Sequence, residues 1–195
     1  MALFKAYRDD IDGNIDLLIP YFNADTRGKE KRLEVFRKHG IDLNKERIYP
    51  MQTLLNYLKD VSEDLGEMNV FSIGHASAYA LDIKNFKNFK DVVEQLNIIY
   101  HTMYTIKGKP LYDPKTKTFE SGLGAYTVTV FDEKNKRMEV KSSTPFHSKF
   151  DEAVLIGLCE KFRTPGITST HVSLDITKER RNFGGDSCTY IITWK

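Results

Sequence analysis

The sequence has 195 residues, 41% hydrophobic and 29% charged, and is long enough for one domain with a substantial core. Its 29 Lys and Arg residues are nearly balanced by 27 Asp and Glu residues, so the net charge of +2 gives no indication of nucleic-acid binding. Two cysteines are too few for a disulfide framework and favour a cytoplasmic location. No apolar run is long enough for a signal peptide or a membrane span, and we expect a single domain over residues 1–195.

Hydrophobic side chains recur at helical spacing through the first half of the chain. Tyr49-Pro50 suits the start of a helix, because the first helical turn does not use the N–H that proline lacks. Gly66 suits the end of that helix, and Gly74 in the next one would let another backbone approach closely. The predicted helices cover residues 14–22, 29–38, 51–65, 69–81 and 87–104.

The pattern of hydrophobic residues changes in the second half of the chain. Residues 107–122 are rich in turn-forming residues and predict a long connection or a flap. The following residues alternate between apolar and polar, which places Tyr126, Val128 and Val130 on one face of a strand and predicts a β-hairpin. The predicted elements of this half are strands at 125–131 and 138–142, a helix at 149–163, and strands at 167–176 and 187–194.

Together these elements predict an α+β fold. The second half has the order β-β-α-β-β, and we expect the other strands to pair onto the last one, which ends at Trp194. N-terminal helices, in about residues 1–106, would pack on a C-terminal antiparallel sheet, in about residues 123–195.

Four stretches carry a resemblance to a known superfamily. They are Tyr49-Pro50-Met51-Gln52 leading to Leu65-Gly66 and Phe71-Ser72-Ile73-Gly74; Leu96-Asn97-Ile98-Ile99-Tyr100-His101; Pro145-Phe146-His147-Ser148-Lys149-Phe150-Asp151 followed by Gly157-Leu158 and Phe162; and Gly185-Asp186-Ser187-Cys188-Thr189-Tyr190 with Trp194. In their order and spacing they resemble the superfamily of haem-NO-binding domains, bacterial 4-vinyl reductase domains and TRAPP vesicle-tethering subunits, and most of all the 4-vinyl-reductase-like sensor domains. The resemblance covers most of the chain from about Gly40 onward.

The resemblance implies a pocket between helices and sheet. Such a pocket takes haem, a tetrapyrrole-like or lipid-like small molecule, or a partner, and relatives commonly form homodimers. Related bacterial domains often carry a cysteine where Ser148 stands and another near Arg180-Arg181, so a thiolate metal site is in doubt here. The Tyr-x-Ser-x-Arg motif that grips haem propionates in the haem-NO-binding domains is not found in this sequence.

Aromatic side chains on predicted inward faces favour an apolar pocket, although the same pattern is typical of an ordinary core. His101 lies roughly where a haem-NO-binding domain would have its proximal histidine, and a neutral imidazole facing an apolar pocket can serve as a haem ligand. The alternative is a half-buried histidine that stabilises the helix C-terminus. His101 and Arg163 are also candidate polar anchors for a ligand. The candidate pocket residues are Phe89, Tyr100, His101, Tyr104, Phe146 and Phe150.

A metal site and a nucleophilic pair are weaker alternatives. His147, His171 and Cys188 with Asp175, or Asp151, as a fourth ligand match no standard zinc spacing, so zinc is not expected. The alternative is a polar sheet face with a buried thiol. Cys188 could also pair with His171 as a nucleophile, but a thiol inside a strand usually packs rather than reacts.

The leading hypothesis is therefore a cytoplasmic, non-catalytic sensor domain that binds a small apolar ligand. A haem-based gas sensor ligated by His101 is the second hypothesis, and a TRAPP-like assembly module is the third. An enzyme is the least favoured class, because no nicotinamide, flavin or phosphate motif and no pair of catalytic carboxylates is apparent. A homodimer is expected from the resemblance, and no nucleic-acid partner is expected.

Overall fold

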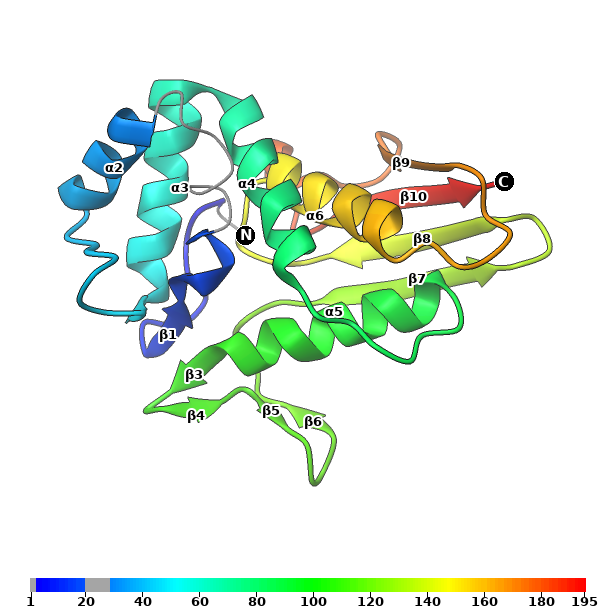
Figure 1. The fold of residues 1–195 in the computed structure, drawn as a ribbon, viewed down its shortest axis with the longest axis horizontal. Coiled ribbons are helices and arrows are strands. Elements are labelled where there is room, and N and C mark those ends of the chain that lie inside the picture. The colour runs from blue at the N-terminus through cyan, green and yellow to red at the C-terminus, as the bar shows by residue number, and fades with distance from the viewer. Residues whose placement is uncertain (1–2, 20–28) are drawn as a thin grey trace.

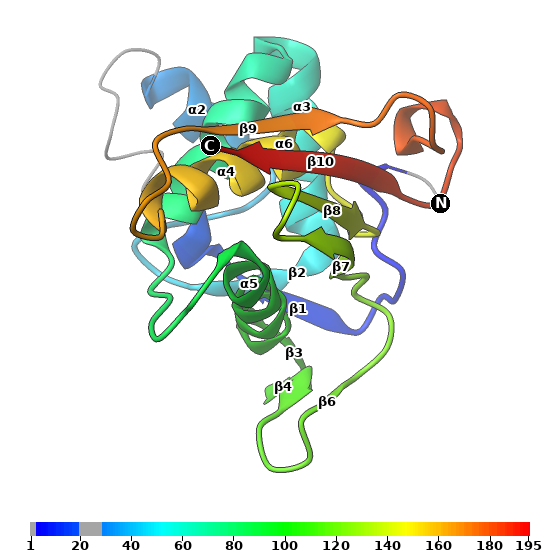
Figure 2. The same cartoon turned by 90° about the vertical axis from the view of Figure 1, so that its right-hand side faces the viewer.

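The computed structural model describes residues 3–19 and 29–195, and Figure 1 shows their fold. A four-stranded sheet forms one side of the molecule, and helices cover one of its faces (Figures 1 and 2). This arrangement belongs to the α+β class that the sequence predicts. No helix among the described residues is long and apolar enough to cross a membrane.

The main sheet is antiparallel throughout. Its strands are β7 (Tyr126–Asp132), β8 (Arg137–Ser142), β9 (Thr170–Leu174) and β10 (Cys188–Trp194), in the spatial order β7-β8-β10-β9. The last strand of the chain thus lies inside the sheet, between β8 and β9. β7 and β9 are its two edges, at the bottom and the top of the sheet in Figure 2.

A β-bulge in β7 changes the predicted facing of one valine. Val128 pairs with Val140, but Val130 pairs with Glu139, so Thr129 is an extra residue in the ladder. The extra residue turns Val130 outward, where 38% of its surface is exposed, and not to the face that buries Tyr126. The prediction that Val130 shares the face of Tyr126 and Val128 is therefore wrong.

Five helices lie within a few residues of the predicted bounds. They are α2 (Lys29–Lys38), α3 (Met51–Leu65), α4 (Glu67–Ala80), α5 (Phe89–Met103) and α6 (Ser148–Lys161). Gly66 separates α3 from α4 with a φ of +88°, a conformation that glycine adopts without strain.

Helices α4 and α6 pack closely because glycines lie in their contact. A Cβ atom on Gly74 would stand only 2.4 Å from the carbonyl oxygen of Phe150, and one on Gly157 would stand 2.8 Å from the Cβ of Ala78. This confirms the close backbone approach predicted at Gly74. Helix α6 in turn lies on the main sheet, so α4, α6 and the sheet form three successive layers (Figure 1).

The first predicted helix, over residues 14–22, is wrong at its start. Residues Ile11–Asn14 form the strand β1, and the short 3₁₀ turn η1 (Ile15–Leu17) follows it. Asn14 ends the strand and caps this turn, because its Oδ1 accepts a hydrogen bond from the backbone N–H of Asp16 at 2.8 Å. The rest of the prediction, beyond residue 19, lies outside the described residues.

A second sheet interrupts the half of the chain that we expected to be helical. Its strands are β1, β2 (Ile48–Pro50), β3 (Tyr104–Ile106) and β4 (Lys109–Pro110), in the order β2-β1-β3-β4. Gly13 lets β1 approach β3, since a Cβ atom there would lie 2.6 Å from the ring of Tyr104. The assignment of residues 1–106 as purely helical is therefore corrected.

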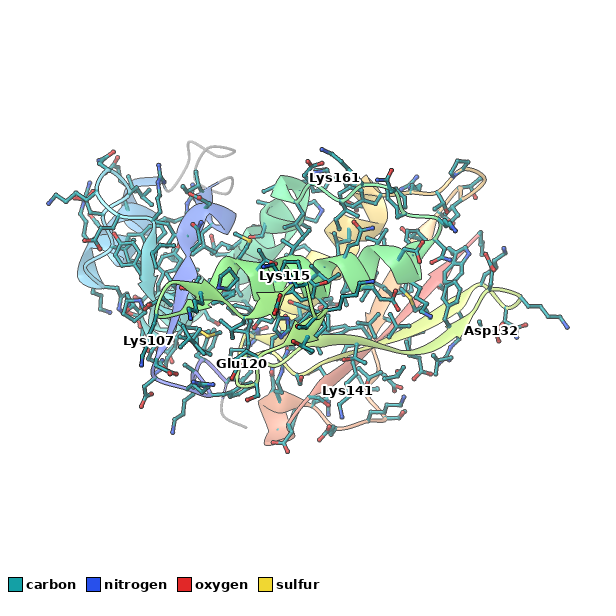
Figure 3. The ribbon with its side chains drawn as sticks, turned by 90° about the horizontal axis from the view of Figure 1, so that it is seen from below. Lys107, Lys115, Glu120, Asp132, Lys141 and Lys161 are labelled. Carbon is teal, nitrogen blue, oxygen red and sulfur yellow. The ribbon has the colours of Figure 1, made fainter. Side chains whose placement is uncertain are left out.

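The turn-rich connection contains its own short strand pair, β5 (Tyr112–Asp113) with β6 (Thr118–Phe119). Leu111 anchors it, because this side chain is buried and its N–H bonds to the carbonyls of His101 and Tyr104 at 3.0 and 3.1 Å. Figure 3 looks onto this side of the molecule, with Lys107, Lys115 and Glu120 labelled. The connection therefore packs against the end of α5.

Candidate functional site

An apolar cavity lies between α3, α4, α5 and α6. Its volume is about 40 Å³, more than the roughly 10–15 Å³ that one water molecule needs and far less than the roughly 150 Å³ of an engineered cavity that binds benzene. The lining residues are Asn14, Leu18, Leu54, Leu58, Ser77, Ala78, Leu81, Leu96, Ile99, Tyr100, Tyr104, Tyr126, Phe146, Phe150 and Val154.

Three hydroxyl groups of the cavity wall are bonded to the protein itself. The hydroxyl of Tyr100 donates to the carbonyl of Leu123 at 2.9 Å, and that of Ser77 donates to the carbonyl four residues earlier at 2.8 Å. The hydroxyl of Tyr126 donates to Oδ1 of Asp151 at 2.6 Å. Burial raises the pKa of Tyr100 and of Tyr126, so both phenols are neutral at physiological pH. A molecule in this cavity would therefore contact mainly apolar atoms.

Four of the six predicted pocket residues line this cavity: Tyr100, Tyr104, Phe146 and Phe150. The rings of Phe146 and Phe150 lie 4.7 Å apart, so the aromatic cluster forms one wall. Phe89 does not belong to it. That side chain is buried at the other end of α5, where its ring stands edge-on to Trp194 at 5.6 Å.

His101 does not line the cavity either. Its Nδ1 lies 2.8 Å from the carbonyl oxygen of Asn97, and its ring lies 4.6 Å from the ring of Phe119 in β6. The side chain is buried against the β5–β6 connection, whereas α5 presents Ile99 and Tyr100 to the cavity. Burial lowers the pKa of His101, although the hydrogen bond to Asn97 opposes this, so the imidazole is neutral at physiological pH.

This lowered pKa predicts a pH dependence of stability. The unfolded chain, in which histidine has its ordinary pKa of about 6.5, binds a proton more readily than the folded protein does. The contribution of His101 to the free energy of unfolding is therefore present above about pH 6.5 and is lost as the pH falls below it. We expect His101→Gln to flatten the slope of stability against pH between about pH 7 and 5, as measured by urea denaturation. An unchanged slope would assign the pH dependence to other groups.

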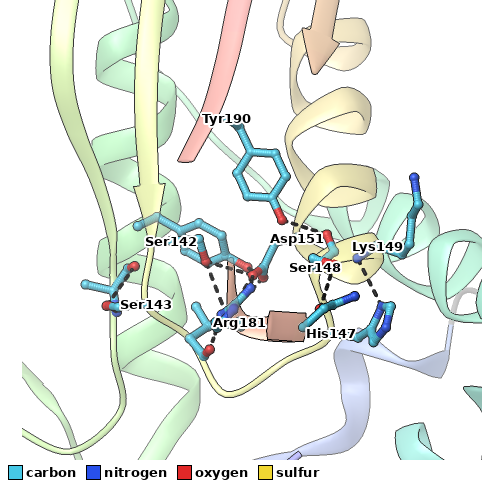
Figure 4. Close-up of polar contacts among 12 residues, drawn as sticks. Ser142, Ser143, His147, Ser148, Lys149, Asp151, Arg181 and Tyr190 are labelled. Carbon is cyan, nitrogen blue, oxygen red and sulfur yellow. Dashed lines mark hydrogen bonds and ion pairs between the residues drawn. The ribbon is translucent and has the colours of Figure 1, made fainter. Parts of the chain in front are cut away.

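A buried polar network lies beside the cavity (Figure 4). Asp151, fully buried in the first turn of α6, forms an ion pair with Nη2 of Arg181. Its carboxylate also accepts hydrogen bonds from Ser142 at 2.7 Å, from Thr144 at 2.9 Å and from Tyr126. The site therefore gives the buried carboxylate a counter-charge and several donors, as a charge removed from water requires.

Arg181 brings this counter-charge from a distant part of the chain. It lies in the 3₁₀ turn η2 (Arg181–Phe183), in the connection between β9 and β10, and its Nη1 donates to the carbonyl and the hydroxyl of Thr144. Its Nε has no hydrogen-bond partner among the described residues. From the sequence, Asp151 is only a possible metal ligand, and no role is expected for Arg181. The sequence does offer one indication: Asp151 lies in the stretch that begins at Pro145, and the basic pair Arg180-Arg181 shortly precedes the stretch that begins at Gly185.

His147 is the N-cap of α6. Its Nδ1 accepts a hydrogen bond from the backbone N–H of Lys149 at 3.2 Å, and its Nε2 lies 3.2 Å from Oε1 of Glu67 at the start of α4. Its ring also stacks on Phe4. Burial lowers the pKa of His147, and Glu67 opposes this shift. These contacts make His147 a structural link between α4 and α6.

The predicted metal ligands do not come together. Among the described residues, no group of three or more His, Cys, Asp and Glu side chains is placed to hold a metal ion. His171 is exposed on β9 opposite Thr193, and Cys188 is buried at the other end of β10. Asp175 instead accepts hydrogen bonds from Thr177 at the end of β9. This separation also rules against the Cys188–His171 nucleophilic pair.

Arg163, predicted as a polar anchor for a ligand, is exposed and donates to the carbonyl of Thr168 at 3.4 Å. It does not reach the cavity.

The fold is an α+β domain with an apolar cavity between its helices and a buried polar network beside that cavity. Several H-NOX domains of solved structure share this fold. One is an H-NOX protein from S. oneidensis in the Fe(II)NO ligation state, with a TM-score of 0.62, 16% identity, and coverage of 92% of this chain and 98% of that one. Another is the H-NOX domain of Shewanella oneidensis in the Fe(II)CO state, with a TM-score of 0.61, 18% identity, and coverage of 94% and 98%.

A third is an oxygen-binding H-NOX domain related to soluble guanylate cyclases, with a TM-score of 0.57, 10% identity, and coverage of 93% of both chains. No family model matches the sequence, and no curated protein is significantly similar to it. At these identities the likeness shows that the chain has the H-NOX fold. The resemblance to 4-vinyl reductase domains and TRAPP subunits stays a prediction.

The residues of this chain do not fit a haem in the described cavity. No histidine or cysteine lines it, and no arginine lines it that could hold a propionate. None of the ten tyrosines of the chain is followed by serine two residues later and arginine four residues later, so the Tyr-x-Ser-x-Arg motif is absent. The buried Arg181 is already paired with Asp151, and the volume of about 40 Å³ is much too small for a macrocycle.

Proposed function

We propose that this chain is a non-catalytic, sensor-type domain of H-NOX fold that binds a small apolar molecule in the cavity between its helices. The observation that carries the proposal is an apolar cavity at the meeting point of four helices, in which the hydroxyls of Ser77, Tyr100 and Tyr126 are already bonded to the protein. Among the described residues, no metal cluster and no Cys–His pair offers a competing reaction.

The cavity also limits the ligand. About 40 Å³ suits a molecule of a few heavy atoms, such as a dissolved gas or a short hydrocarbon. A ligand that needs hydrogen bonds would lose those that it makes in water, because the wall has few groups left to replace them. A larger ligand would require the α5 and α6 walls to move apart.

Two neighbouring isoleucines on α5 test this site. Ile99 lines the cavity, whereas Ile98 does not. We expect xenon, a probe of dry apolar cavities, to shift the methyl NMR signals of Leu58, Leu81 and Val154. Ile99→Phe should fill the space and abolish these shifts, and the matched variant Ile98→Phe should keep them. A wild-type protein without xenon shifts, or equal losses in both variants, would refute the proposed site.

A haem-based gas sensor ligated by His101 is the second candidate, and the H-NOX fold is what favours it. It requires the β5–β6 connection to leave the imidazole and the aromatic cluster to open. In an absorbance titration with haemin, the Soret band of the haemin should shift and sharpen on mixing with the wild type, and not with His101→Ala, if this candidate is right. The same shift with both proteins would indicate binding that does not depend on His101, and no shift with either would leave the small-ligand proposal in place.

A further inference from the structure

The two edges of the main sheet differ in how they are protected. The edge of β7 is covered by α5, because Oδ1 of Asn97 accepts a hydrogen bond from the backbone N–H of Tyr126 at 3.0 Å. The bulge at Thr129 also interrupts it, and α5 runs along this edge below β7 in Figure 1. Bulges and covering helices are the usual means by which proteins block the pairing of edge strands.

The edge of β9 has neither protection. β9 is the upper edge of the sheet in Figure 2, and its ladder with β10 is regular, without a bulge. Residues 168–174, Thr-Ser-Thr-His-Val-Ser-Leu, contain no lysine, acid or proline. An edge strand of this composition is an open template for another strand.

The hydrogen-bond register shows which groups face outward. Ser169 exchanges backbone hydrogen bonds with Lys195, and the N–H of Asp175 donates to the carbonyl of Thr189. Because hydrogen-bonded pairs alternate in an antiparallel ladder, His171 and Ser173 also bond to β10. The N–H and C=O groups of Thr170, Val172 and Leu174 therefore point away from the sheet, and none of them has a backbone partner among the described residues.

We propose that β9 pairs antiparallel with β9 of a second copy of this chain, with Val172 opposite Val172 of the partner. The outward backbone groups of Thr170, Val172 and Leu174 then all find partners, with Thr170 of one copy opposite Leu174 of the other. The two four-stranded sheets become one continuous eight-stranded sheet.

The side chains of β9 favour a second copy of this chain as the partner. Pairing centred on Val172 places Val172 against its own copy and Thr170 against Leu174 on the helix-covered face. On the open face it places His171 opposite Ser173. No two like charges meet across the pair, which removes the usual penalty against self-pairing at an edge. A contact of one short strand per copy is small, so the dimer forms only at higher protein concentration.

Engineered cysteines at positions 171 and 173 can test the register of the proposed strand pair, because a disulfide forms only between residues that lie opposite each other. In the proposed pairing, position 171 of one copy faces position 173 of the other in a non-hydrogen-bonded pair, with Cα atoms roughly 4.5 Å apart. That separation suits a disulfide, whereas two cysteines both at 171, or both at 173, would be diagonal neighbours roughly 7–8 Å apart. The native Cys159 and Cys188 are buried and do not interfere.

We expect an oxidised mixture of His171→Cys and Ser173→Cys proteins to give cross-linked dimers, and each protein alone to give almost none. Thr170→Pro removes one outward N–H without touching the β10 ladder, and should abolish the concentration-dependent dimer in sedimentation equilibrium. Val128→Pro, on the covered β7 edge, is the matched control and should leave the dimer unchanged.

Thermal unfolding of each variant would verify that it is folded. A wild-type protein that stays monomeric at every concentration would overturn the proposal. Cross-linking of either cysteine variant alone would overturn the register, and loss of the dimer in Val128→Pro but not in Thr170→Pro would place the contact at the other edge.

Discussion

Replacing Arg181 with methionine should lower the free energy of unfolding by about 3–5 kcal/mol, because the buried carboxylate of Asp151 then has no counter-charge. The hydrogen bonds from Ser142, Thr144 and Tyr126 remain, but neutral donors do not offset the cost of keeping a full charge out of water. Urea denaturation, with the m-value checked for two-state behaviour, would measure the loss.

Two controls separate charge from packing. Adding Asp151→Asn to Arg181→Met removes both charges and keeps an acceptor for the three hydroxyls, so the double variant should be more stable than Arg181→Met alone. Lys59→Met breaks the exposed pair with Glu63 and should change stability very little. A double variant no better than the single one would mean that Arg181 acts through packing.

Replacing Phe146 with alanine should cost about 3–5 kcal/mol, the usual range for losing a buried phenylalanine. The ring packs against Phe150 and stands edge-on to Tyr100, and it lines the cavity directly. Its removal joins the side-chain volume to the existing space. Benzene should then raise the melting temperature of Phe146→Ala more than that of the wild type, as measured by calorimetry.

The matched control is Phe183→Ala. Phe183 is 75% exposed in the connection between β9 and β10, so its removal leaves no cavity and should alter neither stability nor the response to benzene. If benzene stabilised the wild type as strongly as Phe146→Ala, the native cavity would already accommodate a ring, and the proposed limit on ligand size would be wrong.

The long elements could be predicted because each carries its own periodic pattern. Helix α3 and helix α5 bury several turns of apolar residues, and their predicted bounds differ little from the observed ones. The strands β1 to β6 have two to four residues, which is too short for an alternating pattern to appear. Asn14, for example, follows a glycine and precedes an apolar run, and this pattern predicts the start of a helix.

Part of the cavity wall could also be predicted from helical periodicity. Leu96 and Tyr100 lie one helical turn apart on α5, so a helical pattern identifies the face that lines the cavity. His101 lies about 200° around the helix from Ile99, which also lines the cavity, so the two side chains cannot share one face of α5. The pair of Asp151 with Arg181 could not be predicted, because it joins residues 30 positions apart through the tertiary fold.

The position of β10 inside the main sheet has a consequence for synthesis of the chain. β10 follows every other strand of that sheet in the sequence, yet it joins β8 to β9. As the polypeptide leaves the ribosome, the β7–β8 hairpin and the β9 segment emerge first, and β8 and β9 cannot join one sheet because β10, which lies between them, has not yet emerged. The sheet therefore closes only after residues Cys188–Trp194 have been released, so that folding of this half is completed late and depends on contacts distant in sequence.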